Sequence, residues 1–143
     1  MPGIDVDEAA PGDSGLWATT VAQGFLGRDA VPAGDPALLL ARLTIARPGV
    51  RAFLARIDGE AVAAAAIAVH EGLAVLFSAA TRGGFRNRGA QRALLGARLA
   101  AASAAGCDQA YIATPPGGTA ERYARGAGFR HAYTRMVMVR EWP

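Results

Sequence analysis

The chain has 143 residues, 52% of them hydrophobic and 19% charged, and its 15 basic residues, all arginine, outnumber the 12 acidic ones, for a formal net charge of +3. This composition excludes a disordered chain and predicts one domain over residues 1–143. The apolar stretch Ala61–Val69 is about half of what a membrane span needs, and no basic-then-apolar leader is recognised, so we expect a small soluble protein of the cytoplasm. The single cysteine, Cys107, excludes an internal disulfide and cannot alone supply a metal site.

In the first part of the chain, the spacing of the apolar residues changes from that of a strand to that of a helix. Ile4 and Val6 alternate with aspartates, which predicts an edge strand over 3–8. Apolar residues at helical spacing predict a helix over 14–25, and a proline followed by leucines predicts a second over 36–46. The loop between these helices carries two aspartates, Asp29 and Asp35.

The middle of the chain predicts an antiparallel meander. Strands are expected over 51–57, 61–69 and 73–80, because Asp58–Gly59 is a strong two-residue hairpin signal and a second turn follows at 70–72. Farther along, we expect a helix over 90–105 that ends at a left-handed Gly106. The remaining expected elements are a strand over 110–114, a short helix over 119–126 and two closing strands over 129–133 and 136–140.

The segment from Thr81 to Arg92 is the strongest candidate for a binding site. It joins an apolar strand to the longest expected helix through a loop rich in glycine and arginine. The first amides of a helix have no partner within the helix and carry the positive end of its dipole, so such a junction binds anions. Gly89 lets the main chain approach a ligand, and Arg86, Arg88 and Arg92 add positive charge.

Four other interpretations of this segment are possible, and two of them are other kinds of phosphate loop. It lacks the Gly-Lys-Ser/Thr ending of nucleoside-triphosphate loops and the glycine spacing of dinucleotide folds. The arginines could form a solvated rim around an ordinary turn. They could also belong to a nucleic-acid binder, but basic residues are scattered along the chain and have acidic neighbours in the sequence.

The order of the expected elements and the loop sequence together resemble the GCN5-related N-acetyltransferases. The pyrophosphate loop of that family reads Arg/Gln-x-x-Gly-x-Gly/Ala, and it matches Arg86-Asn87-Arg88-Gly89-Ala90-Gln91, with Gln91 in place of the last small residue. Gly128-Phe129 and Tyr133-Thr134-Arg135 also match the family's ending, so the resemblance covers essentially the whole chain. It implies an α/β (α+β) fold: a central mixed, mostly antiparallel twisted sheet of about six or seven strands, with splayed central strands and four flanking helices.

The resemblance also implies a co-substrate and the residues that bind it. Acetyl-CoA would lie where the strand at 73–80 separates from the strand at 110–114. Main-chain groups of Ala79, Ala80 and Thr81 would pair with the pantetheine arm and polarise the thioester carbonyl. The pyrophosphate would be held by the loop and first helical turn, which comprise Arg86, Asn87, Arg88, Gly89, Ala90, Gln91 and Arg92. No metal is expected.

The catalytic residues follow less directly from the sequence. The strand at 73–80 carries no carboxylate where many relatives place a glutamate, and Ser78 is its only polar side chain. The tyrosine that protonates the thiolate in many relatives would fall at Ala124, but Tyr123 stands one residue earlier. We therefore take Ser78 and Tyr123 as the catalytic candidates.

Because the loop between the first two helices usually borders the acceptor pocket in relatives, the resemblance also implies that Asp29 and Asp35 could attract a cationic amine. The chain is expected to acetylate a small-molecule or peptide amine by direct attack. No nucleic-acid or membrane partner is expected, and a homodimer is one possible assembly. The alternative function is an acyl-CoA-binding module with little or no turnover.

Overall fold

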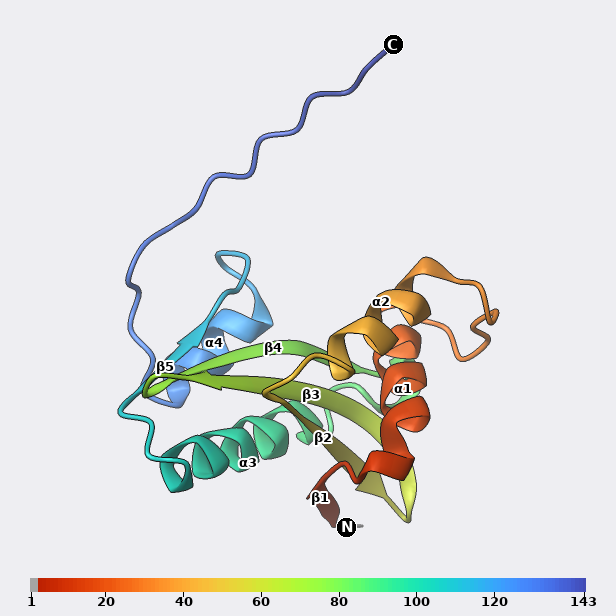
Figure 1. Cartoon of the computed structure of the whole chain (residues 1–143), viewed down its shortest axis with the longest axis horizontal. Coiled ribbons are helices and arrows are strands. Elements are labelled where there is room, and N and C mark those ends of the chain that lie inside the picture. Colours follow the sequence, from red (N-terminus) through yellow and green to blue (C-terminus); the bar gives the residue numbers. More distant parts are fainter. Residues whose placement is uncertain (1–2) are drawn as a thin grey trace. The chain divides into compact units, whose positions relative to one another are not determined.

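The computed structural model describes residues 3–143 and divides the chain into two compact units, unit 1 up to Ala113 and unit 2 over Thr114–Pro143. Unit 1 contains β1 (Ile4–Glu8), the 3-10 turn η1 (Pro11–Asp13), α1 (Ser14–Leu26), α2 (Pro36–Ile45), β2 (Val50–Ile57), β3 (Glu60–His70), β4 (Leu73–Thr81), the 3-10 turn η2 (Gly83–Phe85), α3 (Ala90–Ala104) and β5 (Gln109–Ile112) (Figure 1). No helix among the described residues is long and apolar enough to cross a membrane.

The five strands form one sheet in the order β1-β2-β3-β4-β5, antiparallel except for the parallel pair β4 and β5. The Asp58–Gly59 hairpin turn is confirmed: both residues have positive φ, 52° and 81°, as a type I′ turn requires. Helix α3 ends before Gly106, whose φ of 84° is the left-handed conformation expected there. The mixed, mostly antiparallel sheet expected from the sequence is therefore present, with the crossover helix α3 between its two parallel strands.

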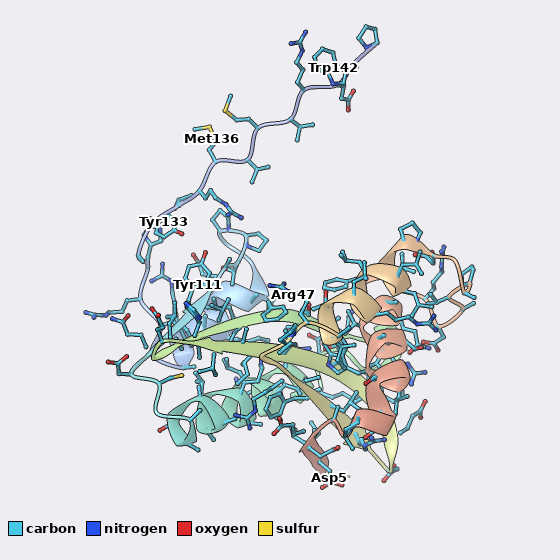
Figure 2. All side chains as sticks on the ribbon, in the orientation of Figure 1. Asp5, Arg47, Tyr111, Tyr133, Met136 and Trp142 are labelled. Carbon is cyan, nitrogen blue, oxygen red and sulfur yellow. The ribbon has the colours of Figure 1, made fainter. Side chains whose placement is uncertain are left out.

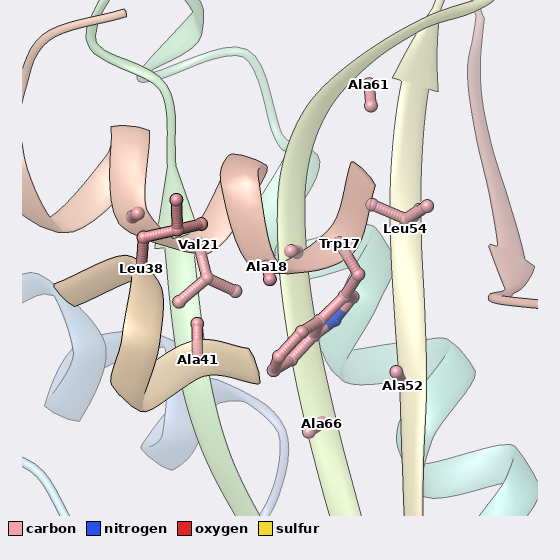
Figure 3. Close-up of a cluster of buried hydrophobic side chains, with 11 residues drawn as sticks. Trp17, Ala18, Val21, Leu38, Ala41, Ala52, Leu54, Ala61 and Ala66 are labelled. Atoms are coloured by element: carbon pink, nitrogen blue, oxygen red, sulfur yellow. The ribbon is translucent and has the colours of Figure 1, made fainter. Parts of the chain in front are cut away.

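The main core lies between the sheet and the helices α1 and α2. Trp17 is fully buried and packs with Val21, Leu38 and alternate residues of β2 and β3, including Leu54 and Ala66 (Figure 3). The other residues of those strands face the opposite side, where α3 contacts the sheet (Figure 1). The helical spacing predicted this face only in part, because the apolar residues Leu16, Phe25, Leu39, Leu40 and Leu43 are exposed.

Unit 2 contains the expected short helix, α4 (Thr119–Gly126), followed by an extended segment with no strand. The strands expected over 129–133 and 136–140 are therefore wrong for this structure, which has five strands instead of six or seven. Alternating apolar residues favour an extended chain, but a strand exists only where a ladder partner satisfies its main chain. Tyr133, Met136 and Trp142 lie along this segment (Figure 2) and are 63%, 83% and 75% exposed.

Candidate functional site

A break in strand pairing occurs in the middle of β4. The parallel ladder to β5 covers only Leu73–Leu76 of β4, and it ends at the pair Leu76 and Ile112. Within residues 77–81, β4 pairs only with β3, at Phe77, Ala80 and Thr81, so the opposite main-chain edge lies beyond the ladder to β5. Main-chain groups without a strand partner can bind a ligand. The splay of the two strands stays a prediction, because β5 itself ends at Ile112.

A β-bulge lies in the same part of β4. The register pairs Ala64 with Ala80 but Ala66 with Phe77, so that Ser78 and Ala79 together lie opposite Ala65. Ser78 has a φ of 55°, the left-handed conformation that non-glycine residues rarely adopt. We call this feature the β4 bulge. Strain of this kind recurs at functional sites, and here it lies directly beside Ala79.

The alternation of the strand shows which groups point outward. The amide of Arg82 donates to Val62 O of β3 at 2.9 Å, so the neighbouring main-chain groups of Thr81 point away from β3. Ala79 is exposed and Ala80 is buried. The main-chain groups of Thr81 therefore line the open edge of β4 beside the exposed Ala79, whereas Ala80 pairs with Ala64 of β3. This edge is the place expected for the acyl arm of acetyl-CoA.

The start of α3 forms the second part of the candidate site. Gly89 is its N-cap with a φ of 88°, Asn87 before it also has a positive φ of 62°, and no side chain caps the helix. The amide of Ala93 donates to Gly89 O at 3.0 Å, which is the first helical bond. The amides of the preceding turn have no helical acceptor, so a 15-residue helix directs the positive end of its dipole at this loop.

Two side chains of the loop motif bind the protein itself. Arg86 donates from Nη2 to Gly24 O at 3.0 Å and from Nε to Thr81 O at 3.4 Å. Gln91 donates from Nε2 to Thr81 Oγ1 at 3.0 Å. The sequence suggested that the guanidinium of Arg86 contacts phosphate; in the structure it joins the loop to the ends of α1 and β4. This arrangement connects the open edge of β4 to the start of α3.

The approach of α1 to β4 depends on a glycine that the sequence did not single out. A Cβ atom added at Gly24 would lie 2.6 Å from Ala80 Cβ and 2.9 Å from Thr81 N, closer than real side chains approach. Glycine therefore brings the end of α1 directly against the candidate site. Its signal in the sequence was weak, because a glycine inside a helix has several explanations.

Arg82 holds the other end of the loop. Its guanidinium donates to Glu60 at 2.7 Å, to Asp29 at 3.2 Å and to Ala61 O at 3.0 Å. It also lies 5.1 Å from the centre of the Phe85 ring, and Arg88 lies 5.3 Å from the same ring, both within cation–π range. These contacts order the turn over 82–88 from residues that are distant in the sequence.

The two aspartates considered as amine sites already have partners. The hydrogen bond from Arg82 lowers the pKa of Asp29, and the carboxylates in turn raise the pKa of Arg82. Asp35 caps α2 by accepting from the Ala37 amide at 2.9 Å and lies 3.5 Å from Arg28. Both carboxylates are thus used within unit 1, which weakens their case as acceptor sites.

The structure brings most of the expected residues into one place within unit 1. Ser78, Ala79, Ala80 and Thr81 stand at the β4 bulge and the open edge of β4, and the loop motif follows them directly. Tyr123 lies on α4 in unit 2, where it is half-buried. Within residues 3–143 no group of three or more His, Cys, Asp or Glu side chains could hold a metal ion.

Solved structures share this fold over nearly the whole chain. The aminoglycoside N-acetyltransferase AAC(6')-Iy, in complex with the bisubstrate analogue CoA-S-monomethyl-acetylneamine, is 18% identical with a TM-score of 0.72 and covers 98% of this chain and 99% of its own. The aminoglycoside acetyltransferase meta-AAC0020, from an uncultured soil metagenomic sample and in complex with sisomicin, is 12% identical with a TM-score of 0.73. The match covers 96% of this chain and 97% of that protein.

A transcriptional regulator from Bacillus halodurans C-125 is similar to the same degree, with 17% identity, a TM-score of 0.72 and coverage of 96% of this chain and 99% of its own. No protein-family model and no curated protein sequence matches the chain. At sequence identities this low, structural similarity shows that the fold is shared. It therefore confirms, for the fold, the resemblance found in the sequence. The activity has to be argued from the site.

Proposed function

We propose that this chain is a GCN5-related N-acetyltransferase: a single domain that binds acetyl-CoA and transfers the acetyl group to a primary amine. The observation that carries the proposal is the connection of the open β4 edge to the uncapped start of α3 through Thr81, Arg86 and Gln91. One end offers main-chain groups to an acyl chain and the other offers amides to phosphates, which are the two requirements of an acyl-CoA site.

In the proposed reaction the nitrogen lone pair of the neutral amine attacks the thioester carbonyl carbon. The carbonyl oxygen takes up negative charge and is stabilised by main-chain amides at Ala79–Thr81. The carbon–sulfur bond then breaks, the amine nitrogen loses its proton to water or to a side chain not yet assigned, and the thiolate of CoA takes up a proton. Ser78 and Tyr123 are the proposed catalytic residues, with Tyr123 as the candidate acid that would supply this proton.

The first turn of α3 and the loop before it are the proposed pyrophosphate site. Amides from Asn87 to Arg92 would donate to the phosphate oxygens, and the exposed guanidinium of Arg88 would add a charged contact. Arg86 would act through its contacts with Gly24 and Thr81 and would not bind the ligand directly.

We further propose a small-molecule or peptide amine as the acceptor. Two proteins of the same fold that are described as aminoglycoside acetyltransferases support the small-molecule class. The exposed apolar residues of 133–142 support a homodimer, which light scattering would detect. The single cysteine, Cys107, agrees with a cytoplasmic location, where disulfides are rare.

The absence of a carboxylate or imidazole from β4 favours a second candidate, an acyl-CoA-binding module without turnover. One experiment separates the two functions. Acetyl-CoA is incubated with the protein and a panel of aminoglycosides, polyamines, amino acids and peptides, and free thiol is measured together with the acetylated product by mass spectrometry. Amine-dependent thiol release supports the enzyme. Binding of CoA by calorimetry, without release across the panel, supports the module, and absence of CoA binding overturns both.

A further inference from the structure

The strand that faces the β4 bulge is contacted by two buried polar side chains. Trp17 of α1 is fully buried, and its Nε1 donates to Ala65 O at 3.1 Å. Arg98 of α3 is 2% exposed, and its Nη1 donates to Ala66 O at 3.3 Å. Ala65 is the β3 residue opposite Ser78 and Ala79. The two bonds therefore reach β3 at the residues that face the bulge.

The two contacts come from opposite sides of the sheet. The Ala66 side chain packs with Trp17 in the core beneath α1 and α2, whereas α3, which carries Arg98, covers the other face (Figures 1 and 3). The run Ala63–Ala66 makes this possible, because its small side chains leave room for an indole on one face and a guanidinium on the other. The small side chains of this run thus allow the side chains of Trp17 and Arg98 to reach the main chain of β3.

The burial of a charged arginine at this position is energetically unfavourable. Its guanidinium donates to two carbonyl oxygens, Ala66 O and Leu94 O, and burial lowers its pKa to about 10. Within residues 3–143 no carboxylate forms an ion pair with it. A buried cation with no carboxylate destabilises a fold, and an apolar side chain of similar size often costs less. An apolar side chain at this position would lack the hydrogen bond to β3 that Arg98 makes.

We propose that Trp17 and Arg98 are positioning residues for acetyl transfer, which fix the β4 bulge by holding the carbonyls of Ala65 and Ala66 from the two faces of the sheet. Ser78 is strained, and a strained conformation persists only where its surroundings determine it. If β3 shifts, the Ala79 main chain turns and its groups no longer point at the thioester. This inference rests on the proposed function, since it explains how the acyl end of that site keeps its geometry.

Four variants test the proposal. Arg98→Met removes the donors but keeps a long apolar side chain, and Arg98→Lys restores one donor. Trp17→Phe removes the indole N–H and keeps a ring. The matched control is Leu94→Ala, which truncates a fully buried side chain one turn earlier on α3 and creates a cavity without removing a bond to β3.

The first measurement requires no activity: hydrogen exchange of the Phe77 and Ala80 amides, which flank the bulge in the ladder. We expect Arg98→Met to speed exchange at both amides by about tenfold beyond Leu94→Ala, after correction for global stability. Trp17→Phe should have a smaller effect in the same direction, and Arg98→Lys should return exchange toward the wild-type rate. Equal exchange in Arg98→Met and Leu94→Ala overturns the proposal, as does a failure of Arg98→Lys to restore protection.

The second measurement is the split between kcat and KM for acetyl-CoA. Arg98→Met should lower kcat by about tenfold, because small misplacements of reacting groups cost up to about a hundredfold, while KM for acetyl-CoA changes little. A change in KM alone would contradict a positioning role. If no amine supports turnover in the wild-type protein, the proposed function fails, and the exchange measurement still decides whether these two side chains hold the bulge.

Discussion

The two ends of the candidate site are built in different ways. At the β4 bulge the main chain is fixed by buried groups, with Trp17 and Arg98 contacting β3 from inside the core. At the loop over 82–89 the main chain is ordered by partly exposed groups, chiefly Arg82 with Asp29, Glu60 and the ring of Phe85. Buried hydrogen bonds are protected from water, whereas ion pairs at the surface contribute little each.

This difference suits the two tasks. A thioester carbonyl needs donors at fixed positions, because the negative charge that develops in the reaction is localised on one oxygen. A pyrophosphate carries more charge, is contacted by several amides at once and tolerates small shifts of the loop. Substitutions of surface side chains should therefore weaken phosphate binding selectively, while the geometry of the acyl end should change mainly with substitutions in the core.

The largest effect is expected at Gly89. Gly89→Val places a β-branched residue at a φ of 88°, where no protein atom is closer than 3.8 Å to an added Cβ, so the cost comes from the backbone conformation. That cost is about 1–2 kcal/mol, so the turn should rearrange and the affinity for CoA, measured by calorimetry, should fall by about tenfold or more. Binding of acetyl-pantetheine, which lacks the phosphates, should fall much less.

Two further variants control for this change. Gly89→Asn should keep most of the affinity, because asparagine tolerates the left-handed region. Gly96→Ala lies in the same helix with open space around it, and it should stabilise the protein by roughly 0.5–1 kcal/mol without changing CoA binding. Unchanged CoA affinity in Gly89→Val would place the pyrophosphate elsewhere.

A smaller effect is expected at Arg82. Arg82→Met removes the bonds to Asp29, Glu60 and Ala61 O together with the contact on Phe85. The loop should loosen, and the Kd for CoA should rise by about threefold, equivalent to less than 1 kcal/mol. Arg56→Gln is the control, since Arg56 pairs with Asp7 and Asp13, outside the loop. Equal loss of acetyl-pantetheine binding would contradict the division between the two ends.

The smallest effect concerns pH. The hydrogen bond from Arg82 lowers the pKa of Asp29 below its ordinary value of 3.8, so the folded state favours the charged carboxylate. The stabilisation is therefore complete above the ordinary pKa and is lost as the pH falls through the lowered one. Thermal unfolding of wild type and Asp29→Asn should differ slightly at neutral pH and converge in acid. A difference that persists in strong acid would mean that the aspartate acts other than through its charge.

Much of the fold could be predicted from short-range patterns. The nine elements from 3–8 to 119–126 appear close to their expected bounds, because alternation, helical spacing and turn residues such as Asp58–Gly59 act within a few positions. The loop motif was found for the same reason. The prediction of the closing strands was wrong, because Met136–Arg140 has the pattern of a strand but no ladder partner among residues 3–143.

The candidate site was predicted less completely. Ser78–Thr81 and Asn87–Arg92 are candidates that the sequence names, and their role stays a prediction. The bulge beside Ala79 was not foreseen, since no pattern of side chains signals which residue of an antiparallel pair will be extra. The partners of Arg82 and Arg86 were also missed. Each bond joins residues that are far apart in the chain, such as Arg86 with Gly24.

The order of the helices and strands, the hairpin turns and the glycine that opens α3 follow from the sequence alone, because they depend on local backbone preferences. The end of the ladder between β4 and β5, the position of the bulge, and the meeting of Trp17 and Arg98 at neighbouring carbonyls of β3 become visible only in the folded chain. The physical reason is distance along the chain: Trp17 and Ala65 are 48 residues apart, and Arg98 and Ala66 are 32 apart, so their hydrogen bonds form only once the sheet and its helices have packed.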